Sequence, residues 1–182
     1  MQKLIPSDLY EWKAGVRKNL FILLAVYGLG ICLVCFTVAI PVAIFITGLV
    51  VADFFIPGES WPMLLSFEKA PEKMLLYKIR RHFLLYAICN LPLIVLFILF
   101  HQDLWYIPFI EFLSLSSIHI YMITVKFACF RIDGNNHVNY ALYLTGIFIG
   151  LIPVTTPFLL LISVYFFQKA CTNLKPLLYD YN

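Results

Sequence analysis

Charge is scarce in this chain of 182 residues, because only 13% of them are Asp, Glu, Lys or Arg. Soluble domains carry about 25% charged residues. Hydrophobic residues make up 62% of the sequence and form long runs without charge, and uncharged runs of about 20 residues are typical of membrane-spanning helices. The composition therefore excludes a soluble globular domain. It predicts an all-α integral membrane protein of the cell (inner or plasma) membrane that crosses the bilayer several times.

Motifs that carry chemistry are also missing from the sequence. There is no G-x-x-x-x-G-K-[ST] nucleotide loop, no H-E-x-x-H metal-binding pair and no G-x-S-x-G nucleophile motif. The His residues and carboxylates do not cluster as metal ligands would, and the five cysteines lie in or beside apolar segments, where free cysteine behaves as a small hydrophobe. We therefore expect no enzyme activity, no catalytic residue, no cofactor, no metal and no nucleic-acid partner.

A basic stretch, EKAPEKMLLYKIRRH, lies at residues 68–82 between long apolar regions, and from Pro71 onward we expect it to be a helix that runs into the next span. Its cations are Lys69, Lys73, Lys78, Arg80 and Arg81. Lys and Arg collect on the cytoplasmic side of a membrane, where anionic lipids attract them. The sequence therefore places the loop 57–82 in the cytoplasm, and its cations contact either lipid headgroups or a soluble partner.

Two apolar runs, residues 19–56 and 138–167, are too long for a single crossing of the membrane, which needs about 20 residues. Basic residues precede and follow each run, so each run must cross twice if all of these residues share one face. Pro41 and the cluster at 153–157 suit the two returns. The sequence thus predicts six apolar segments in three hairpins with both termini cytoplasmic. A four-segment arrangement is the alternative, and it loses the charge asymmetry.

The predicted organisation has three parts. Residues 1–18 form an amphipathic segment at the cytoplasmic interface. Within it, residues 6–18 form a short helix with Trp12 as an anchor among the headgroups, or else they are only the start of the first span. Residues 19–168 form one membrane domain, and residues 169–182 form a cytoplasmic tail. The six segments lie at about 19–38, 41–56, 83–100, 108–130, 138–153 and 157–168. Segments 41–56 and 157–168 are short enough to be either complete spans or re-entrant.

The predicted segment 108–130 is the most polar of the six. A stripe of residues recurs on one helical face at steps of three or four: Glu111, Ser114, Ser117, Tyr121 and Thr124. An ionisable residue within a span is costly and is a functional candidate, so the stripe either lines a polar path or forms hydrogen bonds between helices. We expect His119 to be a packing residue and Lys126 to extend to the membrane surface.

Two further features concern contacts between segments. Gly146 and Gly150 form a G-x-x-x-G pattern, which is a close-packing face for another helix. Asp53 lies close to the inner end of the second segment, where a Lys or Arg on a neighbouring loop can pair with it.

An amphipathic first helix, six expected spans and a basic helical loop at 69–82 together resemble the membrane half of a type-2 ABC exporter. In that family the loop between the second and third spans lies near the ATPase, and the last pair of segments is often broken near the outer face, as the cluster 153–157 is here. The resemblance implies a permease subunit that works with a separate cytoplasmic ATPase subunit, as a homodimer or in a heteromer. The chain is shorter than a usual permease and lacks the larger outer regions of many members.

The alternative function is a non-transporting membrane assembly or regulatory protein that binds partners through its helices. The polar stripe distinguishes the two functions. Transport requires Glu111, Ser114 and Ser117 to line a polar cavity at a symmetric interface, whereas the alternative requires the stripe to be buried within one chain.

Overall fold

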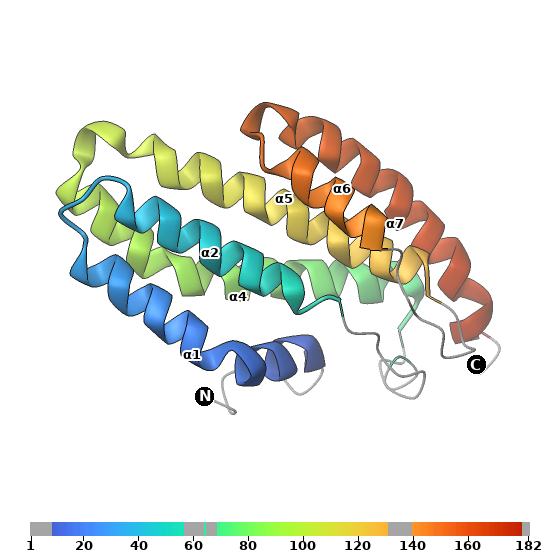
Figure 1. Cartoon of the computed structure of the whole chain (residues 1–182). Coiled ribbons are helices and arrows are strands. Elements are labelled where there is room, and N and C mark those ends of the chain that lie inside the picture. The colour runs from blue at the N-terminus through green and yellow to red at the C-terminus, as the bar shows by residue number, and fades with distance from the viewer. Residues whose placement is uncertain (1–8, 57–63, 65–68, 131–139, 180–182) are drawn as a thin grey trace.

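The protein is an all-helical bundle (Figure 1). The computed structural model describes residues 9–56, 64, 69–130 and 140–179, and this part of the chain contains no β-strand. In chain order the elements are α1 (Tyr10–Cys32), α2 (Ala39–Asp53), α4 (Pro71–Phe100), the 3-10 helix η1 (Gln102–Leu104), α5 (Tyr106–Ala128), α6 (Tyr140–Gly150), the 3-10 helix η2 (Pro153–Thr155) and α7 (Thr156–Tyr179). The predicted all-α fold is confirmed.

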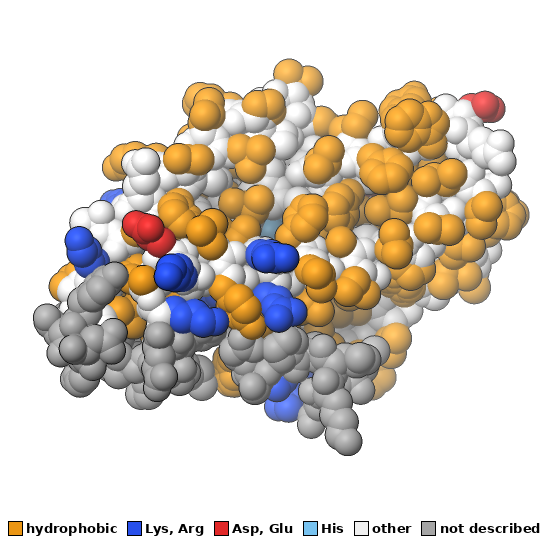
Figure 2. All heavy atoms as spheres, turned by 180° about the vertical axis from the view of Figure 1, so that it is seen from behind, with side chains coloured by type: hydrophobic (Ala, Val, Ile, Leu, Met, Phe, Trp, Pro, Cys, Tyr) orange, Lys and Arg blue, Asp and Glu red, His pale blue; other side chains and the backbone are white. Residues whose placement is uncertain are grey.

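Four of the described helices are long and apolar enough to cross a membrane. They are α1, α4, α5 and α7, whereas α2 and α6 are shorter apolar helices. Hydrophobic side chains cover most of the visible surface in Figure 2, and Lys and Arg gather at one end of it. A surface of this kind suits lipid rather than water, so the structure agrees with a multi-pass membrane protein.

The helix α5 is the centre of the bundle. It packs against α2, α4, α6 and α7, and its contact with α7 is the most extensive in the molecule. Nearly every side chain from Ser114 to Ala128 is buried. Hydroxyl and imidazole groups are costly in contact with lipid tails, so the most polar segment of the sequence lies where the other helices cover it.

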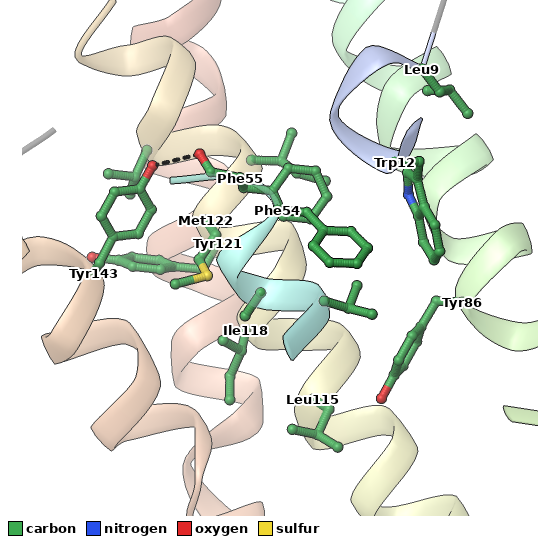
Figure 3. Packing of buried hydrophobic residues seen from close by; sticks show 14 of the residues in the cluster. Leu9, Trp12, Phe54, Phe55, Tyr86, Leu115, Ile118, Tyr121, Met122 and Tyr143 are labelled. Carbon is green, nitrogen blue, oxygen red and sulfur yellow. Dashed lines mark hydrogen bonds between the residues drawn. The ribbon is translucent and has the colours of Figure 1, made fainter. Parts of the chain in front are cut away.

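Large apolar and aromatic side chains fill the space around α5 (Figure 3). Tyr86 comes from α4, and Phe54 and Phe55 follow the end of α2. Tyr143 of α6 donates a hydrogen bond from its hydroxyl to the carbonyl oxygen of Phe55, 3.1 Å away. The core therefore joins helices that are distant in the sequence.

The two ends of the bundle differ in charge. The chain reverses direction at 33–38, 101–105 and 151–155, and these reversals lie away from both termini of the chain (Figure 1). None of the three reversals contains Lys or Arg. His101 Nε2 donates a hydrogen bond to the carbonyl oxygen of Val34 at 2.9 Å, which joins the reversals at 33–38 and 101–105. We call this the reversal end. The opposite end, where the described Lys and Arg residues lie, is the basic end.

A salt bridge ties two helices together at the basic end. Nζ of Lys18 on α1 lies 2.9 Å from Oδ2 of Asp53 at the end of α2. Both side chains are partly exposed, so the pair contributes about 0–1 kcal/mol to stability. Asp53 thus pairs with a basic residue as expected, but the partner lies on helix α1 and not on a loop.

Helix α1 is broken at Asn19, whose φ of −111° and ψ of 15° are not helical. The break falls where the interfacial segment was expected to meet the membrane domain. The expected position of Trp12 among the lipid headgroups is wrong, because Glu11 and Trp12 are only 6% and 3% exposed. Trp12 packs edge-on against Phe54, with ring centroids 5.6 Å apart, so this part of α1 docks onto protein. Residues 1–8 of the predicted interfacial segment lie outside the described residues.

The helix predicted to run from Pro71 into the third span is confirmed, because α4 extends without interruption from Pro71 to Phe100. α7 continues to Tyr179 with Pro176 inside it, so the predicted tail 169–182 begins within a helix, and α7 is long enough to span a membrane. Residues 57–63 and 65–68 of the predicted cytoplasmic loop, residues 131–139 and residues 180–182 lie outside the described part of the chain.

Candidate functional site

A buried ionic cluster joins three helices at the basic end. Nζ of Lys78 on α4 lies 3.0 Å from Oε1 of Glu11 on α1, and Nζ of Lys126 on α5 lies 3.4 Å from the same oxygen. The three side chains are 4%, 6% and 3% exposed, in the order Lys78, Glu11 and Lys126. Burial costs several kcal/mol per ion unless the charges are paired and hydrogen-bonded. The carboxylate of Glu11 therefore offsets part of the cost of burying both lysines.

The predictions for both lysines are wrong. Lys78 was expected to contact lipid or a partner, and Lys126 was expected to extend to the membrane surface. Lys78 instead lies on the face of α4 that is covered by α1 and α5, and its ammonium is 5.1 Å from the centre of the Phe127 ring. A helical repeat shows which residues share a face, but it does not show which face meets protein.

The other four cations of the basic stretch are exposed: Lys69, Lys73, Arg80 and Arg81. Nζ of Lys69 is 4.1 Å from the centre of the Tyr77 ring, and Cζ of Arg81 is 5.4 Å from it. Such cation–π contacts hold the basic side chains close to the helix surface. The start of α4 therefore presents a basic surface, which consists of these four residues.

Next to the ionic cluster, two histidines join α1, α2, α4 and α5. Nε1 of Trp12 donates a hydrogen bond to Nδ1 of His82 at 3.1 Å. Nε2 of His119 donates to the carbonyl oxygen of Gly48 at 2.9 Å. The two imidazole rings meet edge to face, with centroids 4.9 Å apart, and the Tyr86 ring lies 4.6 Å from that of His119. His119 is a packing residue as expected, while Trp12 and His82 were not foreseen in this role.

The partners of the two histidines determine where a neutral ring carries its proton. Indole nitrogen is only a donor, so Nδ1 of His82 accepts and Nε2 carries the hydrogen. A carbonyl only accepts, so His119 carries its hydrogen on Nε2 and keeps a lone pair on Nδ1. No described residue bonds to Nε2 of His82, Nδ1 of His119 or the hydroxyl of Tyr86. The described residues also contain no group of three His, Cys, Asp or Glu side chains that would hold a metal.

Most side chains of the polar stripe on α5 are buried and form hydrogen bonds within the chain. The hydroxyl of Ser117 donates to the carbonyl oxygen of Ser114 at 2.7 Å, and that of Thr124 donates to the carbonyl oxygen of Tyr121 at 2.8 Å. The hydroxyl of Tyr121 donates to the carbonyl oxygen of Leu142 on α6 at 3.0 Å. The side chains of Ser117, Tyr121 and Thr124 are buried within the single chain, so these three form no continuous polar path.

The outer part of the stripe has different surroundings. Glu111 and Ser114 lie in the wall of a cavity of about 250 Å³ at the reversal end. The other wall residues are Pro41, Phe45, Ile107, Ile110, Leu115, Gly150, Leu151 and Pro153. Oε2 of Glu111 is buried and has no hydrogen-bond partner among the described residues. Ser114 Oγ lies 3.3 Å from Oγ1 of Thr156.

The glycine pair packs within the chain. A Cβ at Gly146 would overlap the ring of Tyr121, and one at Gly150 would overlap the side chain of Ile118. Both of these neighbours belong to α5. The G-x-x-x-G face therefore lets α6 approach the central helix closely, and it is occupied by the chain itself.

Comparison of this chain with protein-family models, with curated proteins and with solved structures finds no match. Function is therefore inferred from the two ends of the bundle and from the central helix.

Proposed function

We propose that this chain is a non-transporting assembly or regulatory protein of the membrane, which binds a partner at its basic end. The observation that carries the proposal is the burial of the stripe on α5. Ser117, Tyr121 and Thr124 are enclosed by the chain's own helices and bonded to its own carbonyls. A transport path needs such groups to face a water-filled space, and here they stabilise one protomer.

The proposed topology has six apolar segments in three hairpins, with both termini and the basic end in the cytoplasm. The absence of Lys and Arg from the three reversals supports it. α2 has 15 residues and is about 22 Å long, and α6 has 11 residues and is about 16 Å long, so each is shorter than the hydrocarbon core of about 30 Å. Both pack against α5, and this contact shelters helix ends that stop inside the bilayer.

Cysteine labelling in sealed vesicles tests the topology. Single cysteines at positions 39, 104 and 155 are introduced into a variant without the five native cysteines, and positions 70 and 178 serve as the cytoplasmic set. We expect the first three to react only from the outside and the other two only from the cytoplasmic side. Labelling of Ala39 and Thr155 from the cytoplasmic side would show that the three-hairpin topology is wrong.

The basic surface on α4 is the proposed docking site. Lys69 lies just before α4, and Lys73, Arg80 and Arg81 lie in its first three turns; all four are exposed, and α4 continues into the membrane domain. Fixed positive charge attracts an acidic protein surface and selects against basic ones. The proposed partner is therefore an acidic soluble protein, which docks beside the membrane.

Co-purification from gently solubilised membranes tests the docking. The double variant Lys69→Glu and Lys73→Glu should lose the bound protein. The matched control is Lys169→Glu with Lys175→Glu, which makes the same charge change on exposed positions of α7 and should keep it. Equal retention by both double variants would exclude the basic surface as the docking site.

A permease subunit of an ABC-type exporter is the second candidate function. Two observations favour it: α4 links an exposed basic start directly to a membrane-spanning helix, and Glu111 and Ser114 line a cavity at the far end. Under this function the docked protein is an ATPase. Its reproducible absence from the purified complex, with the basic surface intact, would count against the exporter.

A further inference from the structure

We propose that the cavity at the reversal end binds a small amphipathic organic cation, with the carboxylate of Glu111 as its anionic contact. The cavity, of about 250 Å³, lies between the start of α2, the start of α5 and the reversal after α6. Three elements distant in sequence thus build its walls, and ligand sites are typically concave spaces of this kind, formed in advance by the fold.

The walls determine the body of the ligand. Pro41 and Phe45 from α2 face Ile107 and Leu115 from α5, and Leu151 closes the space from the reversal. Apolar walls favour an aliphatic or aromatic group, and a dry protein cavity of about 150 Å³ is known to accept benzene. A half-open cavity of about 250 Å³ therefore has room for one ring with a short chain.

Glu111 determines the charge of the ligand. Its Oε2 atom is buried without a hydrogen-bond partner among the described residues, which costs free energy in apolar surroundings. The chain has no Lys or Arg between Arg81 and Lys126, so the long helices beside the cavity supply no counter-charge at this end. A protonated amine supplies both the opposite charge and N–H donors, which form short, strong bonds to a carboxylate.

Ser114 adds a second polar contact on the same wall. Its hydroxyl lies one helical turn from Glu111 and 3.3 Å from that of Thr156. A hydroxyl that is already paired can still accept a further hydrogen bond. An ammonium group in the cavity thus meets two oxygen atoms on one side and hydrocarbon on the other sides. An anion would meet an unfavourable charge, so the site selects cations over anions.

The test uses the purified full-length protein in neutral detergent micelles at pH 7. The probe is 2-phenylethylamine, which is protonated at this pH, and its neutral isostere is 2-phenylethanol. Binding is measured by ligand-observed NMR, with empty micelles as the blank for partitioning. The wild-type protein should bind the amine more tightly than the alcohol. Glu111→Gln should weaken amine binding about tenfold or more and leave alcohol binding unchanged, because only the charge-assisted hydrogen bond is lost.

Two further variants keep the outcome decisive. Asp103→Asn removes an exposed carboxylate at the same end and should leave amine binding unchanged. Leu151→Trp fills the cavity while it keeps Glu111, and it should abolish binding of both probes. Equal amine affinity in wild type and Glu111→Gln would overturn the proposal, and so would an equal loss in Asp103→Asn. The cavity and the basic surface lie at opposite ends, so neither result bears on the proposed partner docking.

Discussion

Glu11 and Glu111 are two acidic residues within the same bundle, and their surroundings are opposite. The carboxylate of Glu11 is enclosed at the basic end and contacts two lysines from helices α4 and α5. The carboxylate of Glu111 borders a cavity at the reversal end, where no described residue bonds to Oε2. The first carboxylate holds the fold together, and the second is available to something from outside the chain. Burial alone therefore does not distinguish a structural charge from a binding charge; the partners do.

The largest expected effect comes from removing the charge of Glu11. Glu11→Gln leaves Lys78 and Lys126 buried without that carboxylate, and breaking a buried pair costs about 3–5 kcal/mol. Urea or thermal unfolding in detergent, followed by circular dichroism, measures the loss. Glu72→Gln, which removes an exposed carboxylate from the first turn of α4, is the control and should change stability little.

A double variant sharpens the same result. Glu11→Gln takes the Glu11 carboxylate away from Lys78. Adding Lys78→Met removes this cation as well, so part of the lost stability should return. If the double variant were as unstable as the sum of the two single variants, the ionic contact would not be what stabilises this end.

The next effect concerns the hydrogen bond beside the cluster. Trp12→Phe keeps a ring in place but removes the N–H donor to Nδ1 of His82, and a buried acceptor left unpaired costs about 1–3 kcal/mol. The same unfolding measurement detects it. An unchanged midpoint of unfolding would show that this hydrogen bond between α1 and α4 does not stabilise the fold.

A comparison of two glycines tests how closely α6 packs against α5. A Cβ at Gly146 would overlap the Tyr121 ring, whereas one at Gly28 would meet no atom within 4 Å. Both changes to Ala gain helix propensity, so their difference isolates overpacking, which costs about 1–3 kcal/mol. Gly146→Ala should therefore unfold at a lower denaturant concentration than Gly28→Ala. Equal midpoints would mean that α6 can shift away from α5 without cost.

The smallest expected effect is that of Glu111→Gln in the absence of any added amine. No cation of the described chain loses a partner, so the free energy of unfolding should change by less than about 1 kcal/mol. The same chemical change thus has a large effect at one end and a small one at the other. A loss as large as that of Glu11→Gln would show that Glu111 is also a structural charge.

The fold class and the approximate helix positions could be predicted, because long apolar runs and the positions of Pro and charged residues are local signals. The break at Asn19 and the pairing of Asp53 agree with what those signals indicated. The contacts of Glu11 could not be predicted in this way, since its lysine partners lie 67 and 115 residues away. A basic residue near a predicted membrane surface looks the same in sequence whether it faces lipid or another helix.

One signal in the sequence did point to the central helix. The segment with most hydroxyl groups and a histidine is the one that gains most from leaving lipid, and α5 is indeed enclosed by the others. The division of its stripe between a cavity at Glu111 and packing at Tyr121 required knowledge of where α2, α6 and α7 lie. The helical repeat of the sequence shows which side chains share one face of α5. Whether each of them borders a cavity or packs against protein depends on the helices that lie next to that face.

The central position of α5 also has a consequence for biosynthesis. α5 leaves the ribosome before α7, although α7 makes the most extensive contact with it. Until Thr156 and the helix that begins there have been synthesised, the hydroxyl of Ser114 lacks the Thr156 hydroxyl as a neighbour. One side of α5 is also uncovered. A chain that ended early would display polar groups to lipid within the membrane. The burial of this side of α5 therefore depends on a helix that is synthesised after it.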